Sequence, residues 1–386
     1  MSVAMRNENE TALAVPRGFR PPFCPYEDCS AHDPRARRRG WRPVVKERRW
    51  IARPPHHVTR YTCPECRRSF SDSRFSLDYR CRHAGLAVVV FRLINEGQSM
   101  RQVSRSEQVS LGAVRGVVRR LGAQCLLLHL EVLREVDPLL LGRVQLDGFR
   151  TFAGSQHEPL DLNTLVLANG FFVDIDAASL RRSGSMTVVQ RREREERERR
   201  LGRPDPRARE RSVERILLRW LELLPEEVRP VVATDEEPAY ARVIRRLERG
   251  VIHRTVSSRA RREDRRHILW RTNHEHRLLR HARADHKRET LSFAKRLWGL
   301  LDRAWIHVAW RNLVKGVSER RRKDARTTPA MLLGIRSRPC RPERMFRRRR
   351  FPGIVGLPRE LEPVYLGLAR GRPREVVRPA ARNSVF

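Results

Sequence analysis

Two aspartates follow predicted strands, a position from which a carboxylate can take part in chemistry. Asp147 follows the alternating apolar residues Val144 and Leu146, and Asp235 follows a short apolar run at residues 231–233. Sheet hydrogen bonds fix the backbone there, so two such carboxylates on neighbouring strands can bridge divalent ions. Oxygen ligands suit hard ions such as Mg²⁺, or Mn²⁺, and paired ions promote in-line phosphoryl transfer. The pair predicts a metal-dependent phosphoryl-transfer site that needs a third acid.

The third acid has two main candidates in a helical pattern over roughly residues 273–314. Glu275 and Glu289 lie fourteen residues apart, which at 100° per residue returns them to within about 40° of one helical face. Glu275 has the more usual position after the second aspartate, whereas Glu289 lies in the basic segment 286–290. Glu263 is a weaker third option. Each glutamate could equally pair with a neighbouring arginine on a basic helix, so the choice stays open.

Two closely spaced pairs of cysteines lie near the N-terminus: Cys24 and Cys29, and Cys63 and Cys66. Thiolates at such spacings can clamp one tetrahedral Zn²⁺ and hold together a segment too small for a real core. The sequence therefore predicts one structural zinc. Four unrelated free cysteines remain the alternative, because 33 residues separate the pairs. Cys81 or His83 could replace a ligand.

The composition points to a polyanionic partner. Lysine and arginine total 82 against 45 acidic residues, a formal charge of +37 in 386 residues. Arginine matches phosphate oxygens well, so nucleic-acid binding is the first interpretation and ribosomal or histone-like packing the second. Neither a signal peptide nor an apolar run of about 18 residues is present, which predicts a cytoplasmic protein.

Residues 86–130 have a helical period and predict three helices. Gly97 ends the first, Ser99 with Gln102 has the spacing of a capping box for the second, and Ser110 can cap the third. A short turn between helices favours a helix-turn-helix. Three arginines of the third helix are predicted to reach DNA from the side opposite its valines: Arg115, Arg119 and Arg120. The alternative is a plain three-helix bundle with a basic exterior.

The remainder predicts an α+β arrangement. Apolar runs flank Asn169-Gly170, a strong hairpin signal, and predict three antiparallel strands together with the strand before Asp147. A charged run at 191–200 predicts a solvated helix, and an amphipathic helix and a further strand lead to Asp235. We therefore expect a multidomain α+β protein. Its predicted parts are a mobile arm (1–20), a cysteine-rich unit (21–80), a helical unit (81–135), a mixed-sheet unit (140–335, with a charged insertion at about 185–212) and a basic tail (336–386) that follows DNA or is mobile.

The motifs together resemble bacterial insertion-sequence transposases with a zinc ribbon, a helix-turn-helix and a ribonuclease-H-like DDE domain. The resemblance covers roughly residues 20–350. It rests on C-P-Y-E-D-C at 24–29, Y-T-C-P-E-C-R-R-S-F-S at 61–71, G-Q-S-M-R-Q-V at 97–103, D-G-F-R-T-F at 147–152, T-D-E-E-P-A-Y at 234–240, R-H-A-R-A-D-H-K-R-E-T-L-S-F-A-K-R at 280–296, W-R-N at 310–312 and T-P-A-M-L-L-G at 328–334.

This resemblance implies Mg²⁺-dependent cleavage and transfer of DNA strands at element ends. Asp147 and Asp235 would take the two aspartate positions; the H-K-R-E-T match favours Glu289 as the third acid, and the interval from the second aspartate favours Glu275. Four cations would hold phosphates beside the active face: Lys287, Arg288, Lys295 and Arg296. The chain departs from the pattern at Gly148, where a second acid is expected beside the first aspartate.

The resemblance also sets expectations for partners. They are double-stranded DNA at the element ends and the target, and a second copy of the chain, because transposition needs two DNA ends held together in a homodimer or larger assembly. We expect a cytoplasmic protein associated with the bacterial nucleoid. The alternative function is a DNA-binding regulator or an inactive transposase remnant without catalysis.

Overall fold

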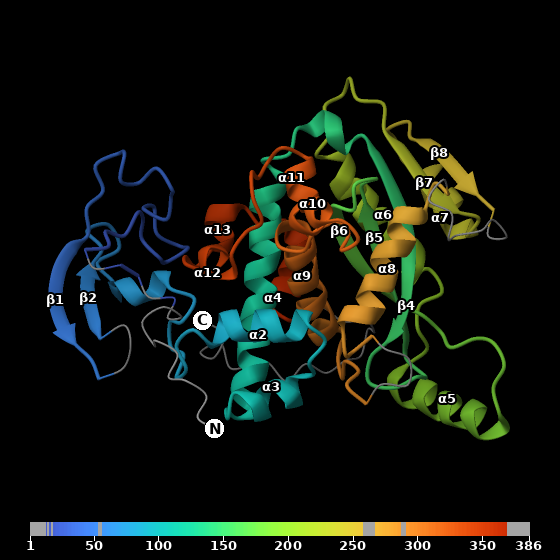
Figure 1. The fold of residues 1–386 in the computed structure, drawn as a ribbon, viewed down its shortest axis with the longest axis horizontal. Coiled ribbons are helices and arrows are strands. Elements are labelled where there is room, and N and C mark those ends of the chain that lie inside the picture. The colour runs from blue at the N-terminus through green and yellow to red at the C-terminus, as the bar shows by residue number, and fades with distance from the viewer. Residues whose placement is uncertain are drawn as a thin grey trace.

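A computed structural model describes residues 13, 15, 16, 18–52, 56–257, 267–286 and 291–368. Over these residues the chain is an α+β protein with a small three-stranded sheet near the N-terminus and a mixed five-stranded sheet, which confirms the expected class. The two sheets lie at opposite ends of the molecule, and the long helices α4 (Leu111–Leu133) and α9 (Leu297–Leu313) stand between them (Figure 1).

The five-stranded sheet combines an antiparallel half and a parallel half. Its order is β6-β5-β4-β7-β8; β4 pairs antiparallel with β5, and β5 with β6, whereas β7 runs parallel to both β4 and β8. The strands are β4 (Arg143–Phe152), β5 (Pro159–Val166), β6 (Phe172–Ser179), β7 (Val231–Asp235) and β8 (Ile252–Val256). The prediction of three antiparallel strands is confirmed.

The turn between β5 and β6 is built by Asn169-Gly170, as its sequence predicts. Gly170 has φ +90°, a left-handed conformation that glycine adopts without a steric penalty. The Asn169 side chain accepts a hydrogen bond from the backbone N–H of Phe171 at 2.9 Å. This local chemistry fixes the register of the hairpin.

Helices cover both faces of the sheet. On β5, Asn163 hydrogen-bonds to Ser212 of α6 (Ala208–Leu221) at 2.8 Å, and the next residue, Thr164, hydrogen-bonds to His276 of α8 (Trp270–Ala282) at 2.8 Å. Because successive residues of a strand point to opposite faces, α6 and α8 lie on opposite faces of the sheet.

The third helix of the predicted helix-turn-helix begins after Ser110 and extends slightly beyond the helical period predicted up to residue 130. It is α4, whose 23 residues follow α2 (Leu86–Asn95) and α3 (Met100–Ser106). Residues 121–129 are all buried, because this half of α4 packs along α9 in one hydrophobic core with the five-stranded sheet. The helical unit and the mixed-sheet unit therefore share a core, although the sequence suggested separate units.

The single helical pattern over residues 273–314 is wrong as a continuous helix. It forms two helices, because α8 ends at Ala282 and α9 begins at Leu297. The residues directly after α8 are drawn into a buried ion-pair cluster, in which Asp285 accepts a hydrogen bond from Arg303 of α9 at 2.7 Å. The prediction that one continuous helix carries both Glu275 and Glu289 is therefore wrong.

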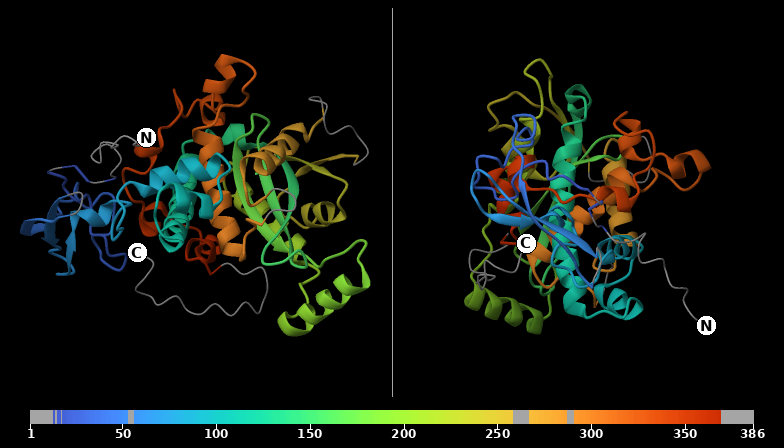
Figure 2. Two further views of the ribbon diagram at one scale, coloured as in Figure 1. Left: turned by 60° about the horizontal axis from the view of Figure 1, so that its bottom comes forward. Right: turned by 90° about the vertical axis from the view of Figure 1, so that its left-hand side faces the viewer.

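The N-terminal sheet contains β1 (Val44–Trp50), β2 (His57–Thr62) and β3 (Ser69–Ser71), followed by η1 (Asp72–Phe75). Within the arm expected over residues 1–20, Leu13 is buried and its backbone N–H donates to Asp78. The charged run forms α5 (Val188–Leu201), which buries none of its side chains and projects from one end of the sheet (Figure 2). That helix confirms the expected solvated helix.

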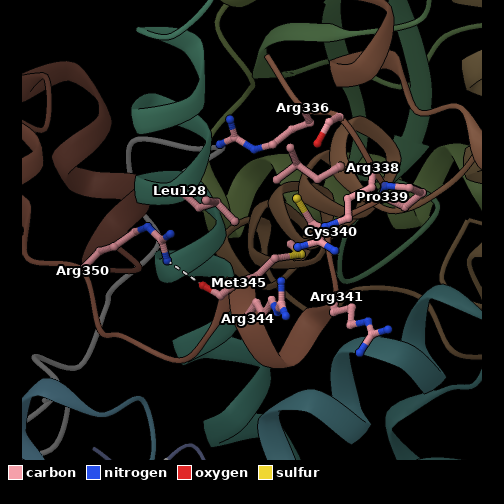
Figure 3. Close-up of a pocket in the computed structure, with 11 residues that line it drawn as sticks. Leu128, Arg336, Arg338, Pro339, Cys340, Arg341, Arg344, Met345 and Arg350 are labelled. Carbon is pink, nitrogen blue, oxygen red and sulfur yellow. Dashed lines mark hydrogen bonds between the residues drawn. The ribbon is translucent and has the colours of Figure 1, made fainter. Parts of the chain in front are cut away.

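The C-terminal segment 336–368 packs on the protein, in contrast to the basic tail expected there. Its helices α12 (Pro342–Met345) and α13 (Pro352–Val355) lie against α2 and α4. Arginines from this segment surround a cavity of about 330 Å³ beside Leu128 and Cys340, where Arg350 donates to the Met345 carbonyl (Figure 3). Apolar residues between the arginines, including Phe346 and Phe351, are buried and hold the segment in place.

Short elements complete the fold: η2 (Pro138–Leu141), α7 (Pro238–Ile244), α10 (Arg322–Arg326), α11 (Pro329–Leu332), η3 (Arg359–Leu361) and α14 (Glu362–Tyr365). None of the helices in the described part of the chain is both long and apolar enough to cross a membrane.

Candidate functional site

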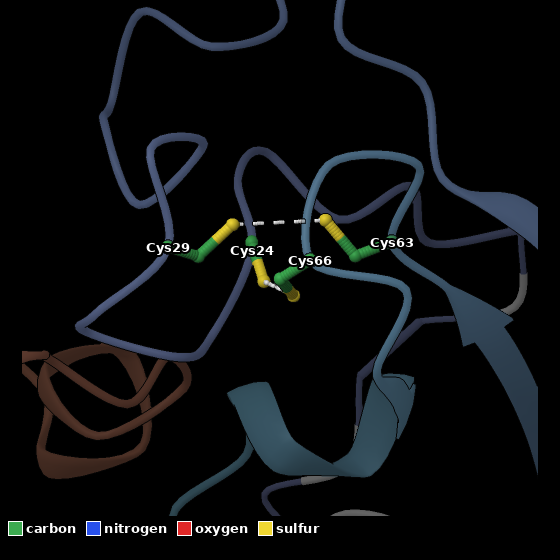
Figure 4. A group of neighbouring side chains, drawn as sticks. All are labelled: Cys24, Cys29, Cys63 and Cys66. Carbon is green, nitrogen blue, oxygen red and sulfur yellow. Dashed lines mark hydrogen bonds between the residues drawn. The ribbon is translucent and has the colours of Figure 1, made fainter.

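The four cysteines of the N-terminal unit converge on one point. Their sulfur atoms all lie within 4.8 Å of one another, with Cys24 3.7 Å from Cys66 and Cys29 3.8 Å from Cys63 (Figure 4). One pair comes from the loop before β1 and the other from the turn between β2 and β3. Four sulfurs that meet from two loops form a possible zinc-binding site.

The surroundings of this cluster suit thiolate ligands. Trp41 donates its indole N–H to the sulfur of Cys63 at 3.4 Å, and the turn that carries Cys66 is closed by Arg67 in a left-handed conformation with φ +57°. Burial raises the pKa of the Cys24 and Cys29 thiols, whereas hydrogen bonds from Arg68, Cys29 and Cys24 together outweigh burial at Cys66 and bring its pKa to about 6. A ring of buried aromatic side chains, including Phe351 from the C-terminal segment, encloses the cluster.

The helix-turn-helix candidate has the capping that the sequence predicts. Ser99 and Gln102 form the reciprocal capping box of α3, and Ser110 accepts from the backbone of Ala113 at the start of α4. Both contacts satisfy backbone N–H groups that a helix start leaves without partners. Local sequence therefore determines where α3 and α4 begin.

The three arginines of α4 have different environments. Arg115 is exposed. Arg119 pairs with Asp302 of α9 at 2.9 Å, and Arg120 donates to the carbonyl oxygens of Leu77 and Tyr79 at 2.6 and 2.8 Å. Arg119 and Arg120 thus bind the helix to its own protein, because the C-terminal segment and residues 77–81 cover that side of α4.

Asp147 and Asp235 lie at the same level of two adjacent parallel strands. The last paired residues of β4 and β7 are Gln145 and Ala233, and each aspartate lies two residues further along its strand. An even spacing keeps both side chains on the face that α8 covers, since Gln145 accepts a hydrogen bond from Thr272 of α8. Both aspartates line one cavity of about 450 Å³. The structure brings these two predicted residues together.

One wall of this cavity is formed by side chains on one face of α8, called here the α8 stripe. Its members recur at helical spacing: Asn273, His276, Arg277 and Arg280. His276 lies 3.7 Å from the Asp147 carboxylate and hydrogen-bonds Thr164, and the guanidinium of Arg280 stacks over Phe149 at 4.6 Å. The stripe therefore places basic and neutral groups next to the two aspartates.

Two further acids line the cavity, Asp161 of β5 and Glu237 at the start of α7. Arg209 of α6 pairs with both, at 2.9 Å from Asp161. Burial raises the pKa of Asp161, although Arg209 and Arg150 lower it. Its Oδ1 atom accepts no hydrogen bond among the described residues and lies where a β-carbon on Gly148 would be 2.5 Å away. Neither acid was predicted from the sequence: Glu237 lies within the motif T-D-E-E-P-A-Y, whereas Asp161 belongs to no motif.

Glu275 does not join the two aspartates. It is fully buried and accepts two hydrogen bonds from Arg311 of α9, at 2.6 and 2.8 Å. On α8 it falls outside the stripe that faces the cavity, since the helical repeat brings Asn273, His276 and Arg280 to that side instead. Glu263 and Glu289 lie outside the described residues.

None of the four cations expected beside the active face is found at the cavity of the aspartates in the described part of the chain. Lys287 and Arg288 lie outside the described residues. Lys295 and Arg296 are exposed and line a separate groove with Arg115 of α4, rather than the cavity of the aspartates. The helical unit that contains α4 and the segment before α9 therefore share a basic surface.

No protein-family model matches the chain, and the search of curated proteins gives no match either.

Proposed function

We propose that this chain is a DNA transposase of the DDE type, which binds the terminal repeats of its element and cleaves and transfers DNA strands with Mg²⁺ or Mn²⁺. The observation that carries the proposal is the placement of Asp147 and Asp235 at one level of adjacent parallel strands, side by side at one cavity. The sheet order β6-β5-β4-β7-β8 supports a ribonuclease-H-like domain around them.

The carboxylates of Asp147 and Asp235 have the ligand chemistry that a hard divalent cation prefers. Both offer carboxylate oxygens from the same face of the sheet. Asp161 lines the same cavity from the face that α6 covers, where Arg209 pairs with it. Asp147 and Asp235 would hold the cation, which when bound supplies charge stabilisation for phosphoryl transfer. Arg277 and Arg280 would hold the scissile phosphate against these carboxylates, because both guanidinium groups line the same cavity.

The cysteine-rich unit and the helix-turn-helix supply contacts to double-stranded DNA. Arg115 is exposed near the start of α4, the position from which a helix-turn-helix reaches the major groove. The zinc-binding unit would add basic residues such as Arg48 and Arg49 on the exposed strand β1. A net charge of +37 favours binding to the DNA backbone at every contact. Two copies of the chain would hold two element ends, and the protein would associate with the bacterial nucleoid.

The test is nicking of DNA that carries the gene with its flanking sequence, with and without Mg²⁺. Wild type is expected to nick at the element ends. Asp147→Asn and Asp235→Asn should each lower the rate at least about 100-fold, equivalent to about 2.7 kcal/mol. Glu248→Gln is the matched control, because Glu248 is an exposed acid away from the cavity. Equal nicking by all four proteins would refute the proposal.

The second candidate function is a DNA-binding regulator or inactive transposase remnant. It is favoured by the wall of α8, which within the described residues presents an asparagine, a histidine and two arginines to the cavity, but no carboxylate. Wild-type protein that binds the element ends and never nicks them, with either Mg²⁺ or Mn²⁺, would favour this function.

A further inference from the structure

A groove of about 870 Å³ separates the helix-turn-helix from the segment that leads into α9. One side is formed by the starts of α3 and α4, and the other by residues 291–303. Six residues characterise it, namely Arg101, Arg115, Phe293, Lys295, Arg296 and Trp298. It is larger than the cavity of Asp147 and Asp235 and shares none of its lining residues.

The rim of the groove carries four exposed cations: Arg101, Arg115, Lys295 and Arg296. Within the described part of the chain, no carboxylate lies within ion-pair distance of any of them. Arg119 differs from these four cations: it lines the same groove, but it forms an ion pair with Asp302 at 2.9 Å. The rim therefore concentrates positive charge that no carboxylate among the described residues balances.

The groove also contains a buried cation with spare hydrogen-bonding capacity. Arg303 is 5% exposed and donates from Nε to Asp285 at 2.7 Å. Its Nη2 atom has no acceptor among the described residues. Because this atom is enclosed within the protein, the Arg303 guanidinium adds positive charge beneath the groove rather than a direct contact to a bound ligand.

Aromatic rings accompany the rim cations. The Lys295 ammonium lies 3.2 Å from the ring centre of Phe293, and the Arg296 guanidinium lies 4.8 Å from that of Trp298. Leu291, at 93% exposure, adds an apolar side chain to the same wall. Cations beside aromatic rings match a polymer whose phosphates alternate with flat bases.

Such a polymer must have its bases accessible. A duplex turns its bases inward, so the rings of this groove can contact bases only on an unpaired strand. The groove also lies close to the strand that carries Asp147. Its residue Phe293 packs against Phe152, the last residue of β4, at 5.0 Å between ring centres. The groove thus begins where the strand that carries Asp147 ends.

We propose that this groove binds an unpaired DNA strand, with its phosphates on Arg101, Arg115, Lys295 and Arg296 and its bases against Phe293 and Trp298. The inference goes beyond the proposed function, since binding of an unpaired strand requires neither terminal repeats nor cleavage. Its location beside β4 would let the groove hold a strand that has separated from its complement near the cavity.

The test is fluorescence anisotropy with a labelled oligo-dT and the full chain, without added divalent cation, so that cleavage does not contribute. Lys295→Ala/Arg296→Ala should weaken binding at least about 10-fold, because two phosphate contacts are lost. Trp298→Ala should weaken it by about 5- to 100-fold through loss of base stacking. The charge-matched control is Arg191→Ala/Arg192→Ala on the exposed helix α5, with an expected change below about 2-fold.

Arg101→Glu is a second groove variant that protects the test against misfolding, because Arg101 is an exposed helical residue of α3 to which the proposed function assigns no duplex contact. It should weaken oligo-dT binding more than the control does. Equal effects of the groove and control variants would overturn the proposal, as would equal loss of binding to a blunt duplex and to oligo-dT. Tighter binding of oligo-rU than of oligo-dT would overturn the assignment to DNA.

Discussion

The carboxylate of Glu275 is fully buried and accepts two hydrogen bonds from the guanidinium of Arg311, which is also fully buried. This pair ties α8 to α9 beneath Gly170, whose β-carbon would lie 2.7 Å from the Glu275 carboxylate. Glu275 therefore holds in place the helix that forms one wall of the cavity, instead of entering the cavity.

We predict that Glu275→Gln lowers the free energy of unfolding by about 3–5 kcal/mol, because it leaves the Arg311 charge buried without its partner. Glu275→Gln/Arg311→Met should recover much of that loss, since the double variant removes both charges. Urea unfolding of the two variants and of Glu248→Gln measures this. An unchanged stability in the single variant, combined with loss of nicking, would instead make Glu275 a catalytic acid.

Zinc binding gives a second prediction. Purified, reduced protein should contain about one equivalent of Zn²⁺, and Cys63→Ser should lose it, because tetrahedral zinc needs all four sulfurs. Metal analysis after gel filtration measures the content. Cys340→Ser is the control, since Cys340 lies in the arginine-rich cavity of the C-terminal segment and not in the cluster. Folded wild type without zinc would contradict the assignment.

Gly148 provides a third prediction. A β-carbon there would lie 2.5 Å from Asp161, so Gly148→Ala must displace the Asp161 carboxylate or bend β4 next to Asp147. We expect about 1–3 kcal/mol of destabilisation and a loss of nicking. Gly250→Ala is the matched control, because nothing lies within 4 Å of a β-carbon at that glycine. Comparable behaviour of the two variants would show that the close approach has no consequence.

The stability of the protein should fall in mild acid through His129. Burial lowers the pKa of His129 from 6.5 to about 4, although its hydrogen bond to the Val173 carbonyl raises it slightly. The unfolded chain therefore binds the proton first, and stability is lost as pH falls from 6.5 towards 4. Between pH 7 and pH 5 this group alone should contribute about 2 kcal/mol. Urea unfolding at both pH values should show a loss that is smaller by that amount in His129→Gln; an identical pH dependence would contradict the prediction.

Local patterns predicted the features that neighbouring residues determine. The Asn169-Gly170 turn, the Ser99 capping box and the position of Asp235 at the end of β7 depend on residues a few positions apart, and the structure contains all of them. Asp147, predicted at a strand end, instead lies in the middle of β4, because β4 continues to pair with β5 as far as Phe152. The cysteine spacing likewise anticipated the cluster of four sulfurs.

Features that depend on distant packing were not predictable in this way. Arg119 and Arg120 have the pattern of an exposed helical face, but residues from both ends of the chain cover it and use both side chains. Asp161 reaches the cavity only because β5 pairs with β4 in a register that brings it beside Gly148. The C-terminal arginines resemble a free tail, yet the aromatic residues between them are buried.

The most direct test of the central claim exchanges the metal preference of the two aspartates. Asp147→Cys and Asp235→Cys replace an oxygen ligand by sulfur, which binds Mg²⁺ poorly and softer ions such as Mn²⁺ better. We predict that neither variant nicks the element ends with Mg²⁺ and that Mn²⁺ restores nicking, whereas wild type uses both ions. Nicking by either variant at the wild-type rate with Mg²⁺ would contradict the claim that these carboxylates form the catalytic centre.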